Sequence, residues 1–287
     1  MPDSDSGCGT VLVITGTFDP TADLVVEELN RRAVPVFRAD TAWFPSSEFP
    51  PELPSEARAV AAAEARGGFG GLLSALPPRW LPPPGRAAEA ESKPLQLRVA
   101  AECGLRVPRT LITNRPEAAR EFAARAGGPV VYKPFTPIRG TAGGRTVAVY
   151  ASVLGPEDLG HPAVASTAHL FQEWVPKAYE VRLTVVGRRV FAAEIHAESE
   201  AARTDWRSDY DSLRYRVCEP PPEVAAGVRR VLGQLGLPYG AFDFVVTPSG
   251  EWVFLEVNPN GQYGFVEQAT GLPITAAICD YLEGAMG

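Results

Sequence analysis

The sequence AFDFVVTPSGEWVFLEVN, residues 241–258, joins two apolar stretches through a Pro-Ser-Gly turn. This pattern predicts two paired strands, and the two-residue period of a strand puts Glu256 and Asn258 on one face. Asp243 lies on the same face if the hairpin register pairs the strands accordingly. Two carboxylates and an amide among apolar neighbours need a counterion, and Mg²⁺ prefers such hard oxygen donors. An exposed hairpin with alternating polar residues is the alternative interpretation.

A second feature is the sequence FQEWVPK, residues 171–177, which reads as a strand that runs into a loop. Such a segment can bind a purine through its main-chain groups. Because Pro176 has no N–H, the donor to the purine must come from Trp174 or Val175. An ordinary edge strand is the alternative interpretation of this segment.

Three charged side chains near these segments suit the sugar and phosphates of a nucleotide. Glu180 could accept hydrogen bonds from ribose hydroxyls, and Arg182, on the same strand face, could meet a terminal phosphate. Lys133 leaves the apolar strand Val130–Lys133 beside a basic, Gly-rich loop at 136–145. The glycines allow close main-chain approach to phosphates, although the loop is not the GxxxxGK[ST] motif. A flexible hairpin is the alternative here.

Lysine is rare in this chain, since only Lys93, Lys133 and Lys177 are lysine among the 27 basic residues. A chain that otherwise uses arginine is expected to keep lysine where a compact point charge is needed, as on one phosphate oxygen. The chance survival of surface lysines is the alternative explanation.

The composition of the 287 residues disfavours several classes of protein. A formal net charge of −7 argues against a general nucleic-acid binder, whose affinity depends on basic residues. No apolar run reaches the roughly 18 residues of a membrane helix, and the acidic N-terminus is unlike a secretion signal. The four cysteines lie far apart, which predicts free thiols in a reducing cytoplasm, and the three histidines lack zinc-ligand spacing.

The N-terminal part is predicted to open with a small βαβ unit. Its strand at 11–14 is followed by a helix, Thr21–Arg32, and a strand, Pro35–Arg38. The turn between the first two, TGTFDP, is not a dinucleotide-binding GxGxxG motif, so it is interpreted as part of the fold. Residues 45–91 are rich in Pro, Ala and Gly, and are expected to contain one helix, Ser55–Arg66, and loops.

The rest of the chain is predicted to have α+β architecture, because a strand-rich region is followed by a helix and a second hairpin. Helices are predicted at Ser92–Cys103, Pro116–Ala126 and Pro222–Leu235, with two short ones at the end. Strands are predicted at Val130–Lys133, Thr146–Tyr150, Leu170–Trp174, Val181–Val186, Val190–Ile195, Phe242–Thr247 and Trp252–Val257.

Together these motifs resemble the ATP-grasp superfamily, and within it the microviridin-type maturases that make graspetides, which are ribosomally made cyclic peptides. The similar stretches are Lys93–Leu97, Gly104–Asn114, Val131–Pro134, 172–187, Asp205–Asp209 and Phe254–Gln262, within about residues 92–287. The resemblance implies an ATP-grasp fold, in which two α+β subdomains hold ATP between them. The implied division is an N-terminal pre-ATP-grasp domain at 1–91, and an ATP-grasp domain at 92–287 made of subdomains 92–170 and 171–287.

The resemblance also implies roles for individual residues. The implied ATP contacts are Lys93 and Lys133 on phosphates, Glu173, Val175 and Glu180 on adenosine, Arg182 near the γ-phosphate, and Asp243, Glu256 and Asn258 on Mg²⁺. Arg207 is assigned to a phosphate or to the activated carboxylate, with an ion pair to Asp205 or Asp209 as the alternative. Lys177 is placed at the edge of the nucleotide.

The N-terminal domain departs from the family pattern. Members of this subgroup usually carry a strand with a Trp/Tyr-Arg-Arg-Pro motif, whereas Phe44-Pro45 passes here almost directly to Pro50. The domain is therefore expected to be shortened, which affects its sheet and its part in the homodimer or in peptide docking that the family implies. The implied partner is a precursor peptide with a leader sequence.

The function implied is ATP-dependent macrocyclisation of that peptide. An Asp or Glu side chain would be phosphorylated by ATP and then joined to a Thr or Ser hydroxyl or a Lys amine. One alternative is an ATP-grasp ligase of free amino acids or small peptides. Another is a non-catalytic, nucleotide-dependent module that binds a peptide.

Overall fold

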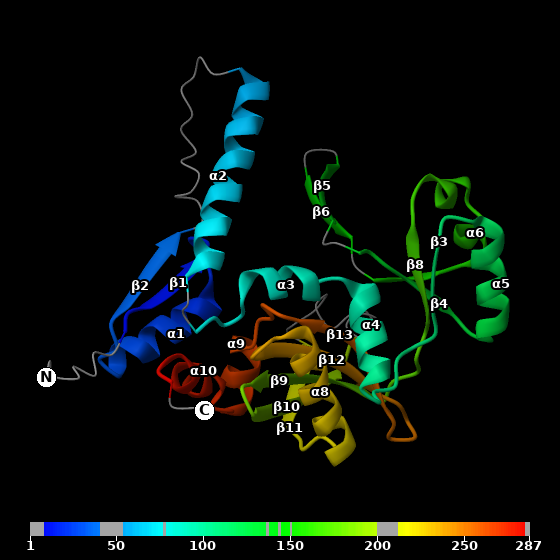
Figure 1. Ribbon diagram of the computed structural model, residues 1–287. Helices are drawn as coiled ribbons and strands as arrows, with labels where there is room; N and C mark the ends of the chain where they lie inside the picture. The colour runs from blue at the N-terminus through cyan, green and yellow to red at the C-terminus, as the bar shows by residue number, and fades with distance from the viewer. Residues whose placement is uncertain are drawn as a thin grey trace, which may run out of the picture.

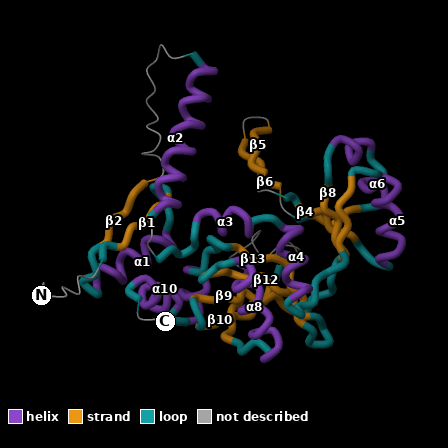
Figure 2. Tube along the Cα trace, in the orientation of Figure 1, coloured by secondary structure: helices purple, strands orange, loops and turns teal. Residues whose placement is uncertain are grey.

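The computed structural model describes residues 9–40, 54–76, 79–135, 138–142, 145–149, 151–199 and 212–284. Its described part contains three units that lie in a row, with a five-stranded sheet in the middle (Figure 1). Helices and strands occur in every unit, which confirms the predicted α+β class (Figure 2).

The N-terminal unit is the expected βαβ arrangement. Its elements are β1 (Val11–Thr15), α1 (Pro20–Arg31) and β2 (Val36–Asp40), and β1 pairs with β2 in parallel. Asp19 caps α1, because its carboxylate accepts a hydrogen bond from the N–H of Ala22 at 3.1 Å, and Pro20 follows at the first helical position. The apolar side of α1 packs on helix α10 (Ile274–Leu282), which attaches the unit to the rest of the molecule.

Helix α2 (Ser55–Ala75) is longer than the predicted helix, which ended at Arg66. The predicted helix stops before the sequence GGFGG, residues 67–71, but the observed helix continues through it. A Cβ at Gly67, Gly68, Gly70 or Gly71 would meet nothing within 4 Å, so no close approach requires these glycines. Figure 1 shows α2 projecting away from the sheets.

A four-stranded sheet with the order β3-β8-β4-β7 forms the second unit. The elements of this unit are β3 (Thr110–Thr113), α5 (Pro116–Ala126), β4 (Val130–Lys133), β5 (Ile138–Ala142), β6 (Arg145–Val149), β7 (Ser152–Leu154), α6 (Pro156–Leu159), a 3₁₀ helix (Pro162–Ser166) and β8 (His169–Glu173). One face packs against α5 through Val130 and Phe171. Strands β5 and β6 form a separate hairpin over the Gly-rich segment.

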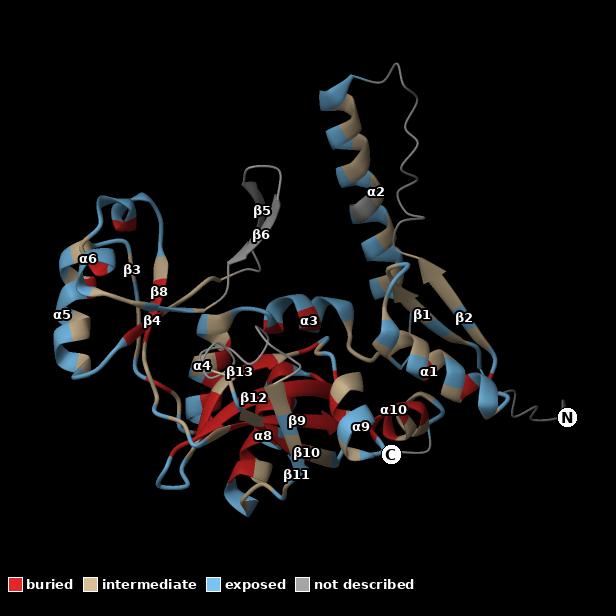
Figure 3. Cartoon of the chain, turned by 180° about the vertical axis from the view of Figure 1, so that it is seen from behind, coloured by how far each residue is buried: buried red, intermediate tan, exposed pale blue. Residues whose placement is uncertain are grey.

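The central unit is an antiparallel sheet with the order β11-β10-β9-β12-β13. Its elements are α3 (Pro84–Ala90), α4 (Lys93–Glu102), β9 (Tyr179–Val186), β10 (Arg189–Ala197), β11 (Leu213–Val217), α8 (Pro222–Leu235), β12 (Tyr239–Val246), β13 (Trp252–Asn258), α9 (Gly264–Thr270) and α10. Helices α4 and α8 cover one face, and α9 and α10 cover the other, with α1 packed on α10. Most buried residues lie in this unit (Figure 3).

The packing of two elements bears on the expected division into subdomains 92–170 and 171–287. Helix α4, which the sequence division placed in the first subdomain, packs against β13 and α8 of the central unit. Strand β8 extends to Glu173 and belongs to the four-stranded sheet. The periodicity of a helix shows which side is apolar but not which sheet that side covers.

Within the described residues, none of the helices combines the length and the apolar character that crossing a bilayer requires.

Candidate functional site

The three predicted magnesium ligands lie together at one end of the central sheet. In the observed register Asp243 of β12 is opposite Glu256 of β13, and Ala241 is opposite Asn258. A bulge between Asp243 and Phe244 shifts the register by one residue, so that Phe244 is opposite Phe254 on the side nearer the turn. Asp243 and Glu256 form the first directly opposed pair beyond the bulge. Asp243 is 4% exposed and Glu256 9% exposed, so the exposed hairpin of the alternative interpretation is not what forms.

Asp243 lies in a buried ionic network with β9. Arg182 is opposite Asp243 in the sheet, and its Nη1 lies 2.7 Å from Asp243 Oδ1. Asn258 Nδ2 donates to Asp243 Oδ2 at 3.3 Å, and Arg182 Nη2 donates to the carbonyl oxygen of Gln262 at 2.8 Å. The guanidinium of Arg182 is therefore buried beside the carboxylate of Asp243, and its expected place near the γ-phosphate stays a prediction.

Glu256 pairs with the first residue of α4. The distance from Lys93 Nζ to Glu256 Oε2 is 2.8 Å, and both side chains are partly buried. Lys93 thus pairs with Glu256, while Arg182 pairs with Asp243 on the neighbouring strand. Lys93 and Glu256, both predicted as site residues, are therefore in direct contact although they are 163 positions apart in the chain.

Gln96 holds α4 in this position, and the sequence reasoning did not assign it a role. Its Nε2 donates to the carbonyl oxygens of Ala90, at 2.6 Å, and Val257, at 2.8 Å. Its Oε1 accepts a hydrogen bond from the N–H of Val257 at 3.0 Å. The N–H and the carbonyl of Val257, the residue between Glu256 and Asn258, are therefore both bonded to Gln96. The signal in the sequence is that Gln96 is a polar residue on the buried side of the predicted helix Ser92–Cys103.

The donor set suits a divalent cation such as Mg²⁺. Asp243, Glu256 and Asn258 offer carboxylate and amide oxygens, and Mg²⁺ is usually held by one or two carboxylates together with substrate phosphates. Across the described ranges there is no group of three or more His, Cys, Asp or Glu side chains that could form an all-protein metal cage. Two carboxylates beside a site for phosphates therefore fit Mg²⁺ better than they fit zinc.

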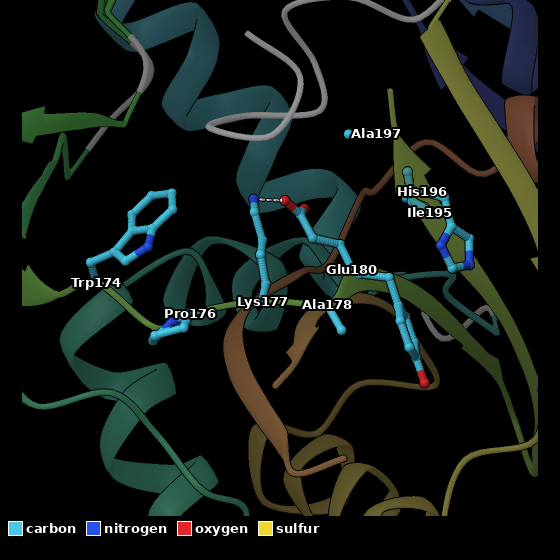
Figure 4. Close-up of a pocket in the computed structure, with 9 residues that line it drawn as sticks. Trp174, Pro176, Lys177, Ala178, Glu180, Ile195, His196 and Ala197 are labelled. Carbon is cyan, nitrogen blue, oxygen red and sulfur yellow. Dashed lines mark hydrogen bonds and ion pairs between the residues drawn. The ribbon is translucent and has the colours of Figure 1, made fainter. Parts of the chain in front are cut away.

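The end of the predicted purine-binding segment and the start of β9, residues 174–180, line a pocket of about 450 Å³, and we call this stretch the hinge. Its walls are Trp174, Pro176, Lys177, Ala178, Tyr179, Glu180, Ile195, His196 and Ala197. Figure 4 shows Lys177 reaching across to Glu180, and these two side chains form an ion pair. The Lys177 ammonium also lies 5.5 Å from the centre of the Trp174 ring, a cation–π contact.

The hinge main chain narrows the choice of purine donor. The N–H of Trp174 donates to the carbonyl of Pro129 at 2.9 Å, as part of the connection to the four-stranded sheet. Because Trp174 uses its N–H in this connection, Val175 is the remaining candidate for the donor to the purine.

Glu173 does not face this pocket. Its carboxylate accepts hydrogen bonds from the main-chain N–H of Arg109 at 3.0 Å and from Arg109 Nε at 2.6 Å. Burial alone would raise the pKa of Glu173, but these hydrogen bonds from Arg109 hold that pKa below its usual value. Glu173 shares a sheet face with Phe171 and Val130, which pack against α5. The side chain of Glu173 is thus held by Arg109, and the expected part of Glu173 in holding adenosine stays a prediction.

Lys133 is at the end of β4, opposite Leu170, on the sheet face that α5 does not cover. The Gly-rich loop at 136–145 was expected to act as a lid, and there the backbone of β5 and β6 is described but their side chains are not. Arg207 and the segment 205–210 lie outside the described residues.

Comparisons with known proteins place this site in context. No protein-family model matches the chain. A curated relative, a probable alpha-L-glutamate ligase of Saccharophagus degradans, is 24% identical over 203 residues, which is 68% of this chain. The chain spans 64% of the length of that relative, somewhat less than two thirds.

Two solved structures are similar over nearly the whole chain. One is a RiPP-associated ATP-grasp ligase of Chryseobacterium gregarium in complex with ADP and a leader and core peptide, with a TM-score of 0.88 and 26% identity, covering 97% of this chain and 98% of that one. Another is the macrocyclase MdnC of Microcystis aeruginosa bound to precursor peptide MdnA, with a TM-score of 0.85 and 26% identity, covering 96% and 100%. The fold of this chain is the ATP-grasp fold, and the resemblance drawn from its sequence is confirmed.

Proposed function

We propose that this chain, which has the ATP-grasp fold, is an ATP-dependent ligase that forms rings within a ribosomally made precursor peptide. The observation that carries the proposal is the convergence of Asp243, Glu256 and Asn258 with Lys93, next to the hinge pocket. The two similar structures, one with ADP and peptides and one with a precursor peptide, support a peptide substrate. ATP as co-substrate and a leader-bearing peptide as partner follow from the same proposal.

The pocket and the carboxylates would hold the two ends of the nucleotide. The N–H of Val175 would bind the purine beside Trp174, and Glu180 would accept from the ribose hydroxyls once Lys177 gives way to them. Lys93 and Lys133 would contact the phosphates as point charges. Mg²⁺, held by Asp243, Glu256 and Asn258, would neutralise charge on the transferring phosphoryl group.

The reaction needs no nucleophile from the enzyme. A carboxylate oxygen of the peptide attacks the γ-phosphorus of ATP, and the bond between that phosphorus and the β,γ-bridging oxygen breaks. ADP departs, and the peptide now carries an acyl phosphate. A Thr or Ser hydroxyl, or a Lys amine, then attacks that carbonyl carbon, loses its proton and expels phosphate. The enzyme supplies positioning and charge neutralisation. Arg207, outside the described residues, is proposed to contact a phosphate or the activated carboxylate.

We place this reaction in the cytoplasm, where ATP is available. Cys103, Cys218 and Cys279 are free thiols in the described part of the chain, which suits a reducing compartment. Burial raises the pKa of Cys218 and of Cys279 to about 11, so neither is an activated nucleophile.

A second candidate function is the addition of glutamate or another amino acid to a peptide. The likeness to a probable alpha-L-glutamate ligase favours it. In that reaction the carboxylate belongs to one molecule and the amine to another.

Mass spectrometry separates the candidates. The purified chain is incubated with Mg²⁺, ATP and a short peptide encoded beside its gene, with and without added free amino acids. Macrocyclisation removes one water per ring and releases ADP, whereas ligation adds the mass of a residue. ATP binding without turnover on any peptide or amino acid would support a non-catalytic module instead.

A further inference from the structure

The first turn of α1 touches the loop that holds Arg182. Gln262 follows β13, and its carbonyl oxygen accepts the hydrogen bond from Arg182 Nη2 at 2.8 Å. The side chain of the same Gln262 accepts a hydrogen bond from the Thr21 hydroxyl and donates one to Asp19, the cap of α1. One residue therefore connects the N-terminal unit to the buried arginine, although Thr21 and Gln262 are 241 positions apart.

The loop that carries Gln262 fits closely against the sheet. A Cβ at Gly261 would lie 2.5 Å from Ala241 Cβ and 2.8 Å from Arg182 Nη2, so only glycine fits there without displacing the arginine or the strand. The hydroxyl of Tyr239 donates to the Gly261 carbonyl from the strand below. On the other side, a Cβ at Gly264 would lie 3.4 Å from the Thr21 hydroxyl. The loop is thus held between the sheet and α1.

Arg182 has few other contacts that could fix it. It is 4% exposed, and its Nε is buried without a hydrogen-bond partner among the residues that the structure describes. The remaining hydrogen bonds go to Asp243 and to the Gln262 carbonyl. Movement of the Gln262 loop would therefore move the guanidinium, and with it the carboxylate of Asp243.

We propose that Thr21 and Gln262 are positioning residues, which tie the N-terminal unit to the Arg182–Asp243 pair and so make this unit an integral part of the active site. The kinetic consequence rests on the proposed function, whereas the structural link does not. Thr21 and Gln262 are proposed to act through Arg182 and not by contact with the substrate. Their effect is expected on the phosphoryl-transfer step and not on binding of the purine at the hinge.

The test compares Thr21→Val, which removes the hydroxyl and keeps the shape, with Thr21→Ser, which keeps the hydroxyl. T21V is expected to lower kcat about threefold to tenfold, the worth of one hydrogen bond, with KM for ATP unchanged within about twofold. T21S should retain wild-type kcat. Gln262→Met also removes the hydrogen bond to Asp19, so it should lose at least as much as T21V. The T21V/Q262M double variant should lose no more than Q262M alone, because Q262M already breaks the contact with Thr21.

Arg32→Met is the matched control. Arg32 also attaches α1 to the body, with Nη1 2.7 Å from Asp280 Oδ1, but it has no contact with the Gln262 loop among the described residues. R32M should lower the melting temperature and leave kcat of the folded enzyme unchanged. Equal kcat in T21V and wild type, or an equal loss in R32M, would overturn the proposal.

A second measurement does not depend on activity. Amide hydrogen exchange in the nucleotide-free chain should become faster at 260–264 in T21V but not in T21S or R32M. If wild type shows no ligase activity while exchange changes as expected, the link stands and the proposed function fails. If exchange at 260–264 is the same in T21V and wild type, the link itself is refuted.

Discussion

Arg182 and Asp243 are both almost fully buried, with side-chain exposures of 5% and 6%. Removing two charges from water is costly, so such a pair is weak support for a role in stability alone. Asn258 and the Lys93–Glu256 pair lie next to the Arg182–Asp243 pair. The two ion pairs bring four charged groups together at one end of the hairpin. An arrangement that is costly for folding and lies beside a pocket is typical of a functional site.

Glu256→Gln tests the carboxylate directly. The change keeps the size of the side chain but removes the charge that faces Lys93, so we expect a folded protein that releases no ADP with peptide and Mg²⁺-ATP. Turnover is measured together with the thermal shift caused by Mg²⁺ and a non-hydrolysable ATP analogue, which should also be lost.

Glu251→Gln is the control for that prediction. Glu251 is on the same hairpin but is exposed and pairs with Arg106 on the surface. E251Q should behave as wild type in both assays. Normal ADP release by E256Q would remove the metal assignment.

The residues of this hairpin could be predicted from sequence because a two-residue period fixes the face of each side chain once the register is known. That register, Asp243 opposite Glu256, is observed. The direction of the Glu173 side chain could not be predicted, since the pattern FQEWVPK does not show which face of β8 looks into the pocket. Its partner Arg109 is 64 positions away, and no local signal connects the two.

At the scale of elements, α4 is the part whose position matters most for the site. It carries Lys93 at its first position, and the Gln96 amide fixes it to the main chain of β13. Predicted strands and helices after residue 92 were largely found, whereas the strands β3, β5, β7 and β11 and the short helix α6 were not predicted. The short sequences of β3 and β11 contain charged or threonine side chains and lack a clear period.

Gln96→Leu is expected to destabilise the fold and loosen the site together. The N–H and carbonyl of Val257 would lose their buried partner, at a cost of about 2–5 kcal/mol for two unsatisfied groups. Urea unfolding gives the stability, and nucleotide affinity should fall in the fraction that remains folded.

Arg98→Gln, on the exposed side of the same helix, is the matched comparison. Arg98 pairs with Glu102 one turn away, and such surface pairs contribute less than about 1 kcal/mol. If Q96L were as stable as R98Q, the amide would not be what holds α4 to β13.

At the scale of the whole molecule, the N-terminal unit is attached through ionic groups as well as through the apolar face of α1. Arg32 reaches Glu28 in its own helix, and Asp280 and Glu283 near the end of the chain. Hydrogen bonds from Arg31 and then Arg32 lower the pKa of Glu28 to about 2. Arg32, and then Arg189, also lower the pKa of Asp280.

These shifts predict how the attachment depends on pH. The carboxyl group that joins α1 to α10 is Asp280. Because Arg32 holds the pKa of Asp280 below its unfolded value of 3.8, its contribution to stability is present in full above that value and is lost as the pH falls through the lower folded pKa. The stability difference between wild type and R32M, from urea unfolding, should therefore shrink between about pH 5 and pH 3. A difference that stays constant over this range would mean that these pairs do not attach the unit.

The central claim is that a carboxylate of a peptide is activated by phosphorylation at this site. The direct measurement uses a precursor peptide whose Asp and Glu side-chain carboxylates carry heavy oxygen, followed by mass analysis of the phosphate released. We predict that each ring formed transfers one labelled oxygen from the peptide to inorganic phosphate, with ADP as the other product. Ring formation that leaves the phosphate unlabelled, or places the label in AMP, would contradict the account.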